Sequence, residues 1–184
     1  DVGEGDAPKA LVKIVTGPQF RLAHPQVVWV GAAPDAASVT AALAAKALKD
    51  GAPGRAADVV SAEGRVVAAI QKRGYADVKA DPREVVVDHA DLSVQATFRI
   101  EAGQIARLDG IQLVTAGGTH SAWLQGLAPW KRGEPYDPED VAELERRLLD
   151  TGVYESVTVA LAPVSSVTSD GLRPIVVSLA ERKP

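Results

Sequence analysis

The chain contains few side chains that could carry catalysis, and their spacing does not bring them together. Its three histidines, His24, His89 and His120, lie in or beside turn-like segments, without the close spacing or paired carboxylates that a metal site needs. Ser121 lacks the flanking glycines of a nucleophile elbow, so a helix cap is its favoured role. The chain has no cysteine, which excludes thiolate nucleophiles, disulfides and cysteine-bound metals. We therefore expect no enzymatic activity, no cofactor and no metal.

Two other stretches have the composition of a ligand site but not its pattern. The glycines of 103–118 form neither a GxGxxG motif nor a phosphate-binding loop with its lysine. The acidic residues of 137–145 are explained by their preference for the positive end of a helix. The formal net charge is −4. Neither half of the chain is basic, so we expect no nucleic-acid partner.

Composition bounds the class of protein. The 184 residues suffice for one large domain or two small ones, and the hydrophobic share of 46% is that of a globular chain. No apolar run approaches the roughly 18 to 20 residues that a membrane helix needs. Methionine is absent, also from position 1, which predicts that the sequence is a piece of a longer polypeptide.

An internal repeat organises the chain. A pattern of glycine, arginine and apolar residues that begins at Gly17 recurs from Gly103 onward, and each copy is followed by a similar helical pattern. We interpret the chain as two copies of one unit, unit one at 17–102 and unit two at 103–184.

Each unit is predicted to run strand, helix, helix, strand, strand. The first strands lie at 20–30 and 105–115, where apolar residues alternate between glycines. The first helix of unit one opens at Asp35. Its apolar residues, four apart, are Val39, Leu43 and Ala47. In unit two, Thr119 or Ser121 could cap a short helix.

The second helix of unit two carries the clearest signals. Asp137 suits the N-cap, Pro138 the first helical position and Gly152 the residue after the helix. Glu143 and Arg147 form a favourable pair four residues apart. The apolar stripe of this helix consists of Val141, Leu144, Leu148 and Leu149. The corresponding stripe in unit one consists of Val59, Val66 and Ile70.

The last two strands of each unit follow an aromatic residue, Tyr75 in unit one and Tyr154 in unit two. The predicted second strands are 76–80 and 156–161. The predicted closing strands are 92–100 and 175–179. The Ser- and Thr-rich segment 163–174 is interpreted as a hairpin loop.

The three tryptophans could either contact a polypeptide or pack the core. Trp29 is expected at a half-buried position on an edge strand. We expect at least one of Trp123 and Trp130 in the core, because large aromatic side chains dominate small cores.

These features resemble POTRA (polypeptide-transport-associated) domains. In unit two, G-E-P-Y at 133–136 and T-G-V-Y-E-S-V at 151–157 are similar to the family's G-x-x-Y … L-x-x-T-G-x-F-x-x-V pattern. Tyr154 stands where the family often has phenylalanine. In unit one the resemblance rests on G-Y-A-D-V at 74–78 and on the repeat.

Further stretches narrow the resemblance to the BamA/TamA superfamily of outer-membrane assembly factors. The segment 17–22 is similar to the junction between POTRA units, and 176–184 to the end of the last unit before the family's β-barrel. The strand with V-V-V-D-H-A at 85–90 is most similar to TamA-type factors. The resemblance implies that 1–16 is the remnant of a preceding POTRA domain, with its closing strand at 10–15.

The resemblance implies an α+β fold of two tandem β-α-α-β-β units, each a three-stranded mixed sheet with two helices on one face. It implies the periplasmic part of an outer-membrane protein of a Gram-negative bacterium, which binds unfolded outer-membrane or autotransporter polypeptides. The implied partners also include a TamB-like protein anchored in the inner membrane and the chain's own C-terminal β-barrel. The alternatives are a structural adaptor to that partner, and the POTRA region of a BamA-like or two-partner-secretion transporter.

The resemblance also places the second strand of each unit at a sheet edge, where unpaired backbone groups could accept an extended chain. The alternative is that these edges are merely exposed and that Lys79, Asp81 and Pro82 protect one of them from aggregation. The candidate residues are Ala76, Val78, Lys79, Ala80, Ser156, Val157, Thr158, Val159 and Leu161.

The alternating apolar segment 10–15 should be adhesive once its own sheet is missing. We expect it to fray or to pair with an exposed edge, in this molecule or in a second copy.

Replacing Leu144 or Leu148 by alanine should destabilise unit two by roughly 2 to 5 kcal/mol, because both lie on the strongest apolar stripe. Chemical denaturation measures the loss in the free energy of unfolding. A loss below about 0.5 kcal/mol would place the residue on the surface instead.

Overall fold

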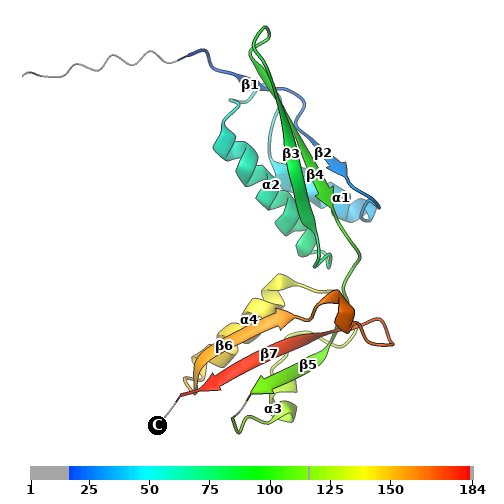
Figure 1. Ribbon diagram of the computed structural model, residues 1–184, viewed down its shortest axis with the longest axis vertical. Coiled ribbons are helices and arrows are strands. Elements are labelled where there is room, and N and C mark those ends of the chain that lie inside the picture. Colours follow the sequence, from blue (N-terminus) through cyan, green and yellow to red (C-terminus); the bar gives the residue numbers. More distant parts are fainter. Residues whose placement is uncertain (1–16, 116, 183–184) are drawn as a thin grey trace, which may run out of the picture.

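The computed structural model describes residues 17–115 and 117–182, as two α+β units stacked end to end along the long axis (Figure 1). The elements of unit one are β1 (Arg21–Leu22), β2 (Gln26–Trp29), α1 (Ala36–Lys46), α2 (Ala56–Gln71), β3 (Lys79–Asp88) and β4 (Ser93–Glu101). Those of unit two are β5 (Leu108–Thr115), α3 (Ser121–Gln125), α4 (Pro138–Asp150), β6 (Tyr154–Leu161), the 3₁₀ turn η1 (Val164–Ser166) and β7 (Arg173–Glu181). No helix in the described ranges is both long and apolar enough to cross a membrane.

In each unit the closing strand lies at the centre of the sheet. β4 pairs in parallel with β1 and β2 on one side and antiparallel with β3 on the other. β7 likewise lies between the parallel β5 and the antiparallel β6. The helices of each unit cover one face of its sheet (Figure 1). The predicted fold class, two tandem β-α-α-β-β units with mixed sheets, is confirmed.

The first strand of unit one is broken, whereas the sequence predicted one strand over 20–30. His24 has a left-handed φ of 46° and Pro25 has no N–H, so the ladder is interrupted between β1 and β2. The backbone N–H of His24 donates to the carboxylate of Asp50 instead, at 2.6 Å. Unit one therefore has four strands by count, with β1 and β2 sharing one side of β4.

The two helices of unit one differ in how well their patterns predicted the buried face. On α2 the predicted stripe is buried, together with Ala62. On α1 the apolar residues spaced four apart do not form the buried face, because Ser38 and Ala42 face the core while Leu43 is 46% exposed. Ala47 is the left-handed C-cap. Small residues on the buried face let α1 pack closely, which apolar spacing alone does not reveal.

The tyrosine after the second helix ties each unit together. The Tyr75 hydroxyl accepts a hydrogen bond from the N–H of Asp35 at 3.0 Å and donates to its carboxylate at 3.2 Å. Hydrogen bonds from the side chain and backbone of Ser38, with that from Tyr75, hold the pKa of Asp35 at about 2. In unit two the Tyr154 hydroxyl lies 3.0 Å from the hydroxyl of Thr119, just before α3. The same contact thus recurs at the same place in both units.

The structure confirms most of the expectations for α4. Asp137 caps the helix by accepting from the N–H of Glu139 at 2.8 Å, and Glu143 pairs with Arg147 at 2.7 Å. Leu144 and Leu148 are fully buried. The inclusion of Leu149 in the stripe was wrong, because its side chain is 46% exposed.

The first helix of unit two is a short turn with a different start from the one predicted. His120, not Thr119 or Ser121, occupies the N-cap, and no side chain caps the helix. Trp130 is buried and donates its indole N–H to the carbonyl of Asp109 at 3.0 Å, which confirms that one tryptophan lies in the core. Trp29 is half-buried against the core of unit one.

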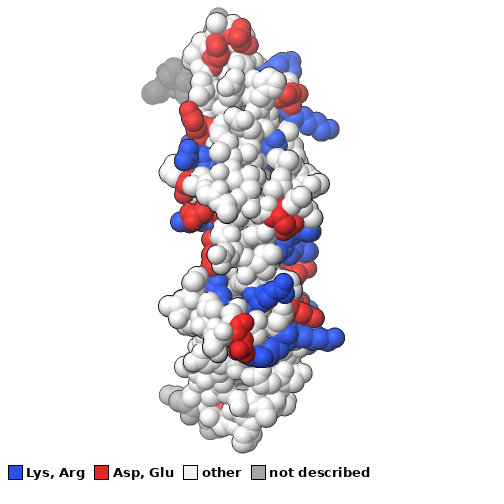
Figure 2. All heavy atoms as spheres, turned by 90° about the vertical axis from the view of Figure 1, so that its right-hand side faces the viewer, with Lys and Arg blue, Asp and Glu red and all other residues white. Residues whose placement is uncertain are grey.

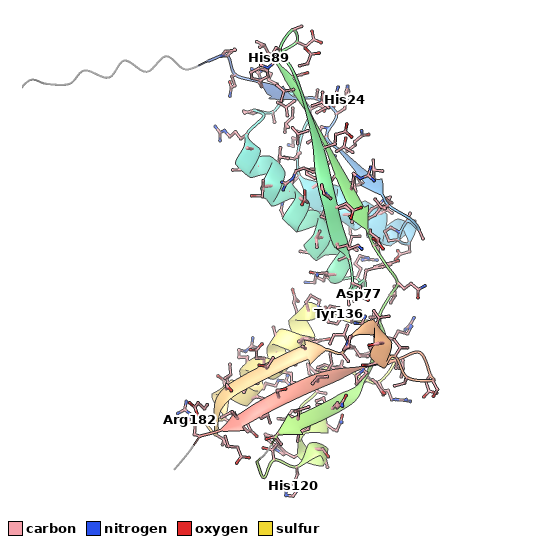
Figure 3. The ribbon with its side chains drawn as sticks, viewed as in Figure 1. His24, Asp77, His89, His120, Tyr136 and Arg182 are labelled. Atoms are coloured by element: carbon pink, nitrogen blue, oxygen red, sulfur yellow. The ribbon has the colours of Figure 1, made fainter. Side chains whose placement is uncertain are left out.

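A nearly buried arginine joins the two units. The guanidinium of Arg173, 7% exposed, donates to the carbonyl of Ala162 and to the carboxylate of Asp77 in unit one, the latter at 2.6 Å. Lys72 and Glu139 form a second, exposed ion pair across the junction, at 2.5 Å. Figure 3 shows Asp77 facing unit two at this junction.

The junction backbone is close-packed as well. The N–H of Ala106 donates to the carbonyl of Gly74 at 2.8 Å. Gly74 has a φ of 98°, and a Cβ there would lie 3.1 Å from side-chain atoms of Ile105 and Pro135. Glycine is therefore needed here for its left-handed backbone and for the close approach. Residues 10–15, which were expected to fray or to pair, lie outside the described residues.

We expect the two units to tumble as one body and Asp77→Ala to loosen them, because the buried Arg173 loses its carboxylate partner. NMR relaxation should give one rotational correlation time for both units in the parent and two different values in D77A. Asp91→Ala is the matched control, since Asp91 is an exposed residue of the β3–β4 turn. Independent rotational diffusion of the parent's units would contradict rigid coupling.

Candidate functional site

The two sheets have four edges, since β1 and β2 share one, and two of these edges are poor sites for strand addition. The edge formed by β1 and β2 is short and interrupted. On β5, the side-chain amide of Gln125 accepts from the N–H of Ile111 at 3.0 Å and donates to its carbonyl at 2.7 Å. The amide occupies the edge as a neighbouring strand would. The edges left for an extended chain are β3 and β6.

A β-bulge decides which side chains of β3 face the helices. The pairing with β4 shifts between Asp81 and Glu84, which accommodates one extra residue beside Pro82. Because side chains alternate along a strand, the shift places Val85 and Val87 opposite the buried residues of β4, on the helix side. Without the bulge, this side would carry Glu84.

The same two valines direct their backbone groups to the free edge. The carbonyls of Val94 and Ile100 accept hydrogen bonds from the first-strand side, so the alternate residues 95, 97 and 99 of β4 direct their backbone groups to β3. One of those residues pairs with Val86 of β3. Val86 therefore bonds inward, and the N–H and C=O groups of Val85 and Val87 point outward. An added strand would pair with these two residues.

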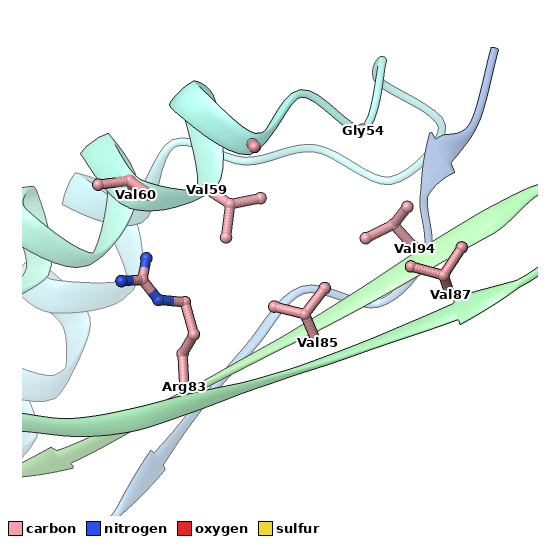
Figure 4. A pocket seen from close by; sticks show the side chains of 8 residues that line it. Gly54, Val59, Val60, Arg83, Val85, Val87 and Val94 are labelled. Atoms are coloured by element: carbon pink, nitrogen blue, oxygen red, sulfur yellow. The ribbon is translucent and has the colours of Figure 1, made fainter. Parts of the chain in front are cut away.

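An apolar groove lies between the upper half of β3 and the start of α2 (Figure 4). Its volume is about 370 Å³. Val85 and Val87 are 45% and 46% exposed although they face the helices. An ion pair of Arg83 with Glu63, at 3.1 Å, links β3 to α2 at this groove. The groove, called the valine groove below, is lined by Gly54, Ala56, Val59, Val60, Arg83, Val85, Val87 and Val94.

β6 has a free edge, but its side chains on the helix side fill the core and leave no groove beside that edge. The N–H of Ala162 donates to Pro174 of the β7 segment, so the alternate residues Val157, Val159 and Leu161 direct their backbone groups outward. The side chains of Val157 and Val159 are only 9% and 8% exposed, in the core beneath α4. A chain added here would pair with backbone groups without an adjoining groove.

The predicted site residues therefore fare differently in the two units. Ser156, Val157, Thr158, Val159 and Leu161 all lie on β6, an edge strand. In unit one the predicted strand was placed too early, because β3 begins at Lys79 and ends at Asp88. Ala76 and Val78 precede it, and Val78 is buried at 7% exposure.

The remaining two predicted residues, Lys79 and Ala80, open β3, and the Lys79 ammonium pairs with Glu101 at 2.8 Å. Sequence reasoning missed Val85 and Val87 as site residues. The signal for them in the sequence was the run of three consecutive valines at 85–87, because a half-buried strand ordinarily alternates apolar and polar residues.

A third surface is distinguished by its lack of charge. The segment from Gly110 to Trp130 contains no Asp, Glu, Lys or Arg. Figure 2 shows the lower end of the molecule, where this segment lies, almost without charged side chains. Val114 and Trp123 are 52% and 46% exposed there.

The histidines do not form a common site. His24 and His89 lie in unit one, and His120 at the far end of unit two (Figure 3). His24 is 3.3 Å from Asp50, and the ring of His89 contacts Phe20 edge to face. Within 17–115 and 117–182, no group of three or more His, Asp or Glu residues could hold a metal ion.

The structure is similar to solved POTRA structures, while no protein-family model matches the chain. POTRA domains 3–5 of BamA from Haemophilus influenzae superpose with a TM-score of 0.66 and 20% identity, over 90% of this chain and 63% of that one. BamA from Haemophilus ducreyi lacking POTRA domains 1–3 gives 0.70 and 20%, over 89% and 30%. POTRA domains 1–2 of Omp85 from Anabaena give 0.55 and 16%, over 92% and 99%.

These likenesses establish the fold, a tandem of POTRA-type units. The chain spans 63% and 30% of the two BamA structures.

Amide hydrogen exchange should alternate along both edges. In β3, Val85 and Val87 should exchange fast, and Val86 slowly, because only Val86 bonds to β4. In β6 the residues Val157 and Val159 should likewise exchange faster than their neighbours. The opposite alternation would contradict the register of the site.

Proposed function

We propose that the chain is the periplasmic POTRA region of an outer-membrane assembly or translocation factor, and that the β3 edge with the valine groove binds extended client polypeptides. The observation that carries the proposal is the coincidence of free backbone groups and an open apolar groove at Val85 and Val87. The POTRA fold supports the general role. A binding mode through the main chain suits many clients, because it depends little on their side chains.

The geometry selects amphipathic strands. Side chains on one face of an added strand would enter the valine groove, while those on the other face would lie beside Glu84 and Val86. Strands of outer-membrane barrels alternate between apolar and polar residues with this period. Unfolded outer-membrane and autotransporter polypeptides are therefore the proposed clients. β6 would serve as a second edge of lower affinity.

The finer assignment is a TamA-like factor. It rests on the resemblance of the strand with V-V-V-D-H-A, which forms the rim of the valine groove. With that assignment come the remaining proposed partners, a TamB-like protein anchored in the inner membrane and the chain's own C-terminal β-barrel. BamA-like and two-partner-secretion transporters are the alternative branches.

A second candidate function is that of a structural adaptor to the inner-membrane partner. One observation favours it, the uncharged end of unit two with its exposed Trp123 and Val114. Exposed aromatic side chains on an uncharged surface are typical of contacts with folded proteins.

Titration with amphipathic barrel-strand peptides tests the client proposal. NMR shifts or line broadening should concentrate on 83–88 and on the start of α2. Val85→Asp should weaken binding about tenfold, because it places a charge in the apolar groove. Val86→Asp is the matched control, equally exposed but on the other face of the same strand, and should change the affinity little. Equal effects of both variants, or shifts confined to 110–130, would contradict the proposal.

A further inference from the structure

From Ser156 to Leu161 the β6 edge lacks the features that commonly protect an edge strand, because the charged Glu155 and the register shift of β6 lie before this stretch. Its residues from Ser156 to Leu161 include no charge and no proline, and they pair with β7 in regular register. Natural edges are usually blunted by charges, proline, bulges or a covering element. β3 carries the first three of these, and Gln125 covers β5. The stretch from Ser156 to Leu161 is thus the least protected edge among the described residues.

The outward backbone groups of β6 define how an identical strand would pair with it. Val157, Val159 and Leu161 direct these groups to the free edge, so an antiparallel copy would place Val159 opposite the Val159 of the second copy. Thr158 would then lie opposite Ala160 of the second copy. The nearest charged residue, Glu155, would face Pro163, so like charges do not meet.

The β3 edge is less suited than the β6 edge to pairing with the same strand of a second copy. In the register that pairs Val85 with Val87 of a second copy, Glu84 of each chain would lie opposite Asp88 of the other. Like charges directly opposite each other destabilise a sheet, and here the repulsion would occur twice. In this register β3 repels its own copy, whereas the register of β6 centred on Val159 brings no like charges together.

We propose that β6 pairs antiparallel with β6 of a second copy about a two-fold axis at Val159, which joins the two unit-two sheets into one six-stranded sheet. Figure 1 shows β6 beside β7, at the end of the sheet opposite β5. Two short strands bury far less than the roughly 1,600 Å² of a standard interface. The dimer is therefore weak, with a dissociation constant of about 100 µM or more, and the clients of the β3 edge do not compete with it.

Two double variants test the register directly. Thr158 and Ala160 are exposed and face away from the helices, so both variants keep the core. T158K/A160K places lysine opposite lysine and should weaken the dimer at least about tenfold. T158K/A160E places lysine opposite glutamate and should leave the dimer as stable as the parent's or more so. Sedimentation from about 20 µM to about 2 mM measures both.

A monomeric parent at the highest concentration, or equal effects of the two double variants, would overturn the proposal. Since the chain has no cysteine, a spin label on Thr158→Cys gives a second measurement. The spin-labelled variant is mixed with ¹⁵N-labelled parent that carries no spin label. The spin label should then broaden the amide signals of Val159 and Ala160 in the parent. Broadening confined to β3 would contradict β6 pairing even if the double variants fail to fold. Unchanged peptide binding at Val85 in T158K/A160K separates this proposal from that of client binding.

Discussion

The position of the closing strand at the centre of each sheet is the constraint on which the rest of the structure depends. A strand with neighbours on both sides satisfies its own backbone groups but leaves the outer strands with unpaired ones. Each unit must therefore manage two free edges. β1 and β2 are interrupted at His24, Gln125 covers β5 at Ile111, and β3 is bulged and charged. β6 has such features only at its start, before Ser156.

The position of an inserted residue distinguishes the edge strands of the two units, since it lies within β3 but at the start of β6. In unit two the register of β6 shifts only at its start, between Tyr154 and Ser156, and its valines fill the core under α4. In unit one the bulge beside Pro82 shifts the alternation of β3, so valines instead of Glu84 face α2. These valines remain nearly half exposed, and the space above them is the valine groove. The same β-α-α-β-β unit thus yields a free edge without a groove in unit two and a free edge with a groove in unit one.

The sequence predicted elements with strong local signals and missed what depends on tertiary packing. α4 was predicted nearly to its ends, because Asp137, Pro138 and the buried leucines act within the helix. The buried face of α1 was not predicted, because it contains small residues such as Ser38, whose burial depends on hydrogen bonds with Asp35 and Arg73. Val85 and Val87 could not be assigned to the groove, since their orientation depends on a bulge that no local pattern fixes.

The segment 74–78 shows how one short motif serves several levels of the structure. Gly74 allows the close approach of unit two, Tyr75 ties the start of α1 to the end of α2, and Asp77 neutralises the buried Arg173 at the start of β7. Asp77 lies two residues before β3, and Arg173 belongs to the strand that pairs with β6. The ion pair therefore links the grooved edge of one unit to the central strand of the other. Any change in the angle between the units must either break the ion pair and leave a buried charge without its partner, or move both residues together. The relative orientation of the two edges is therefore part of the fold itself.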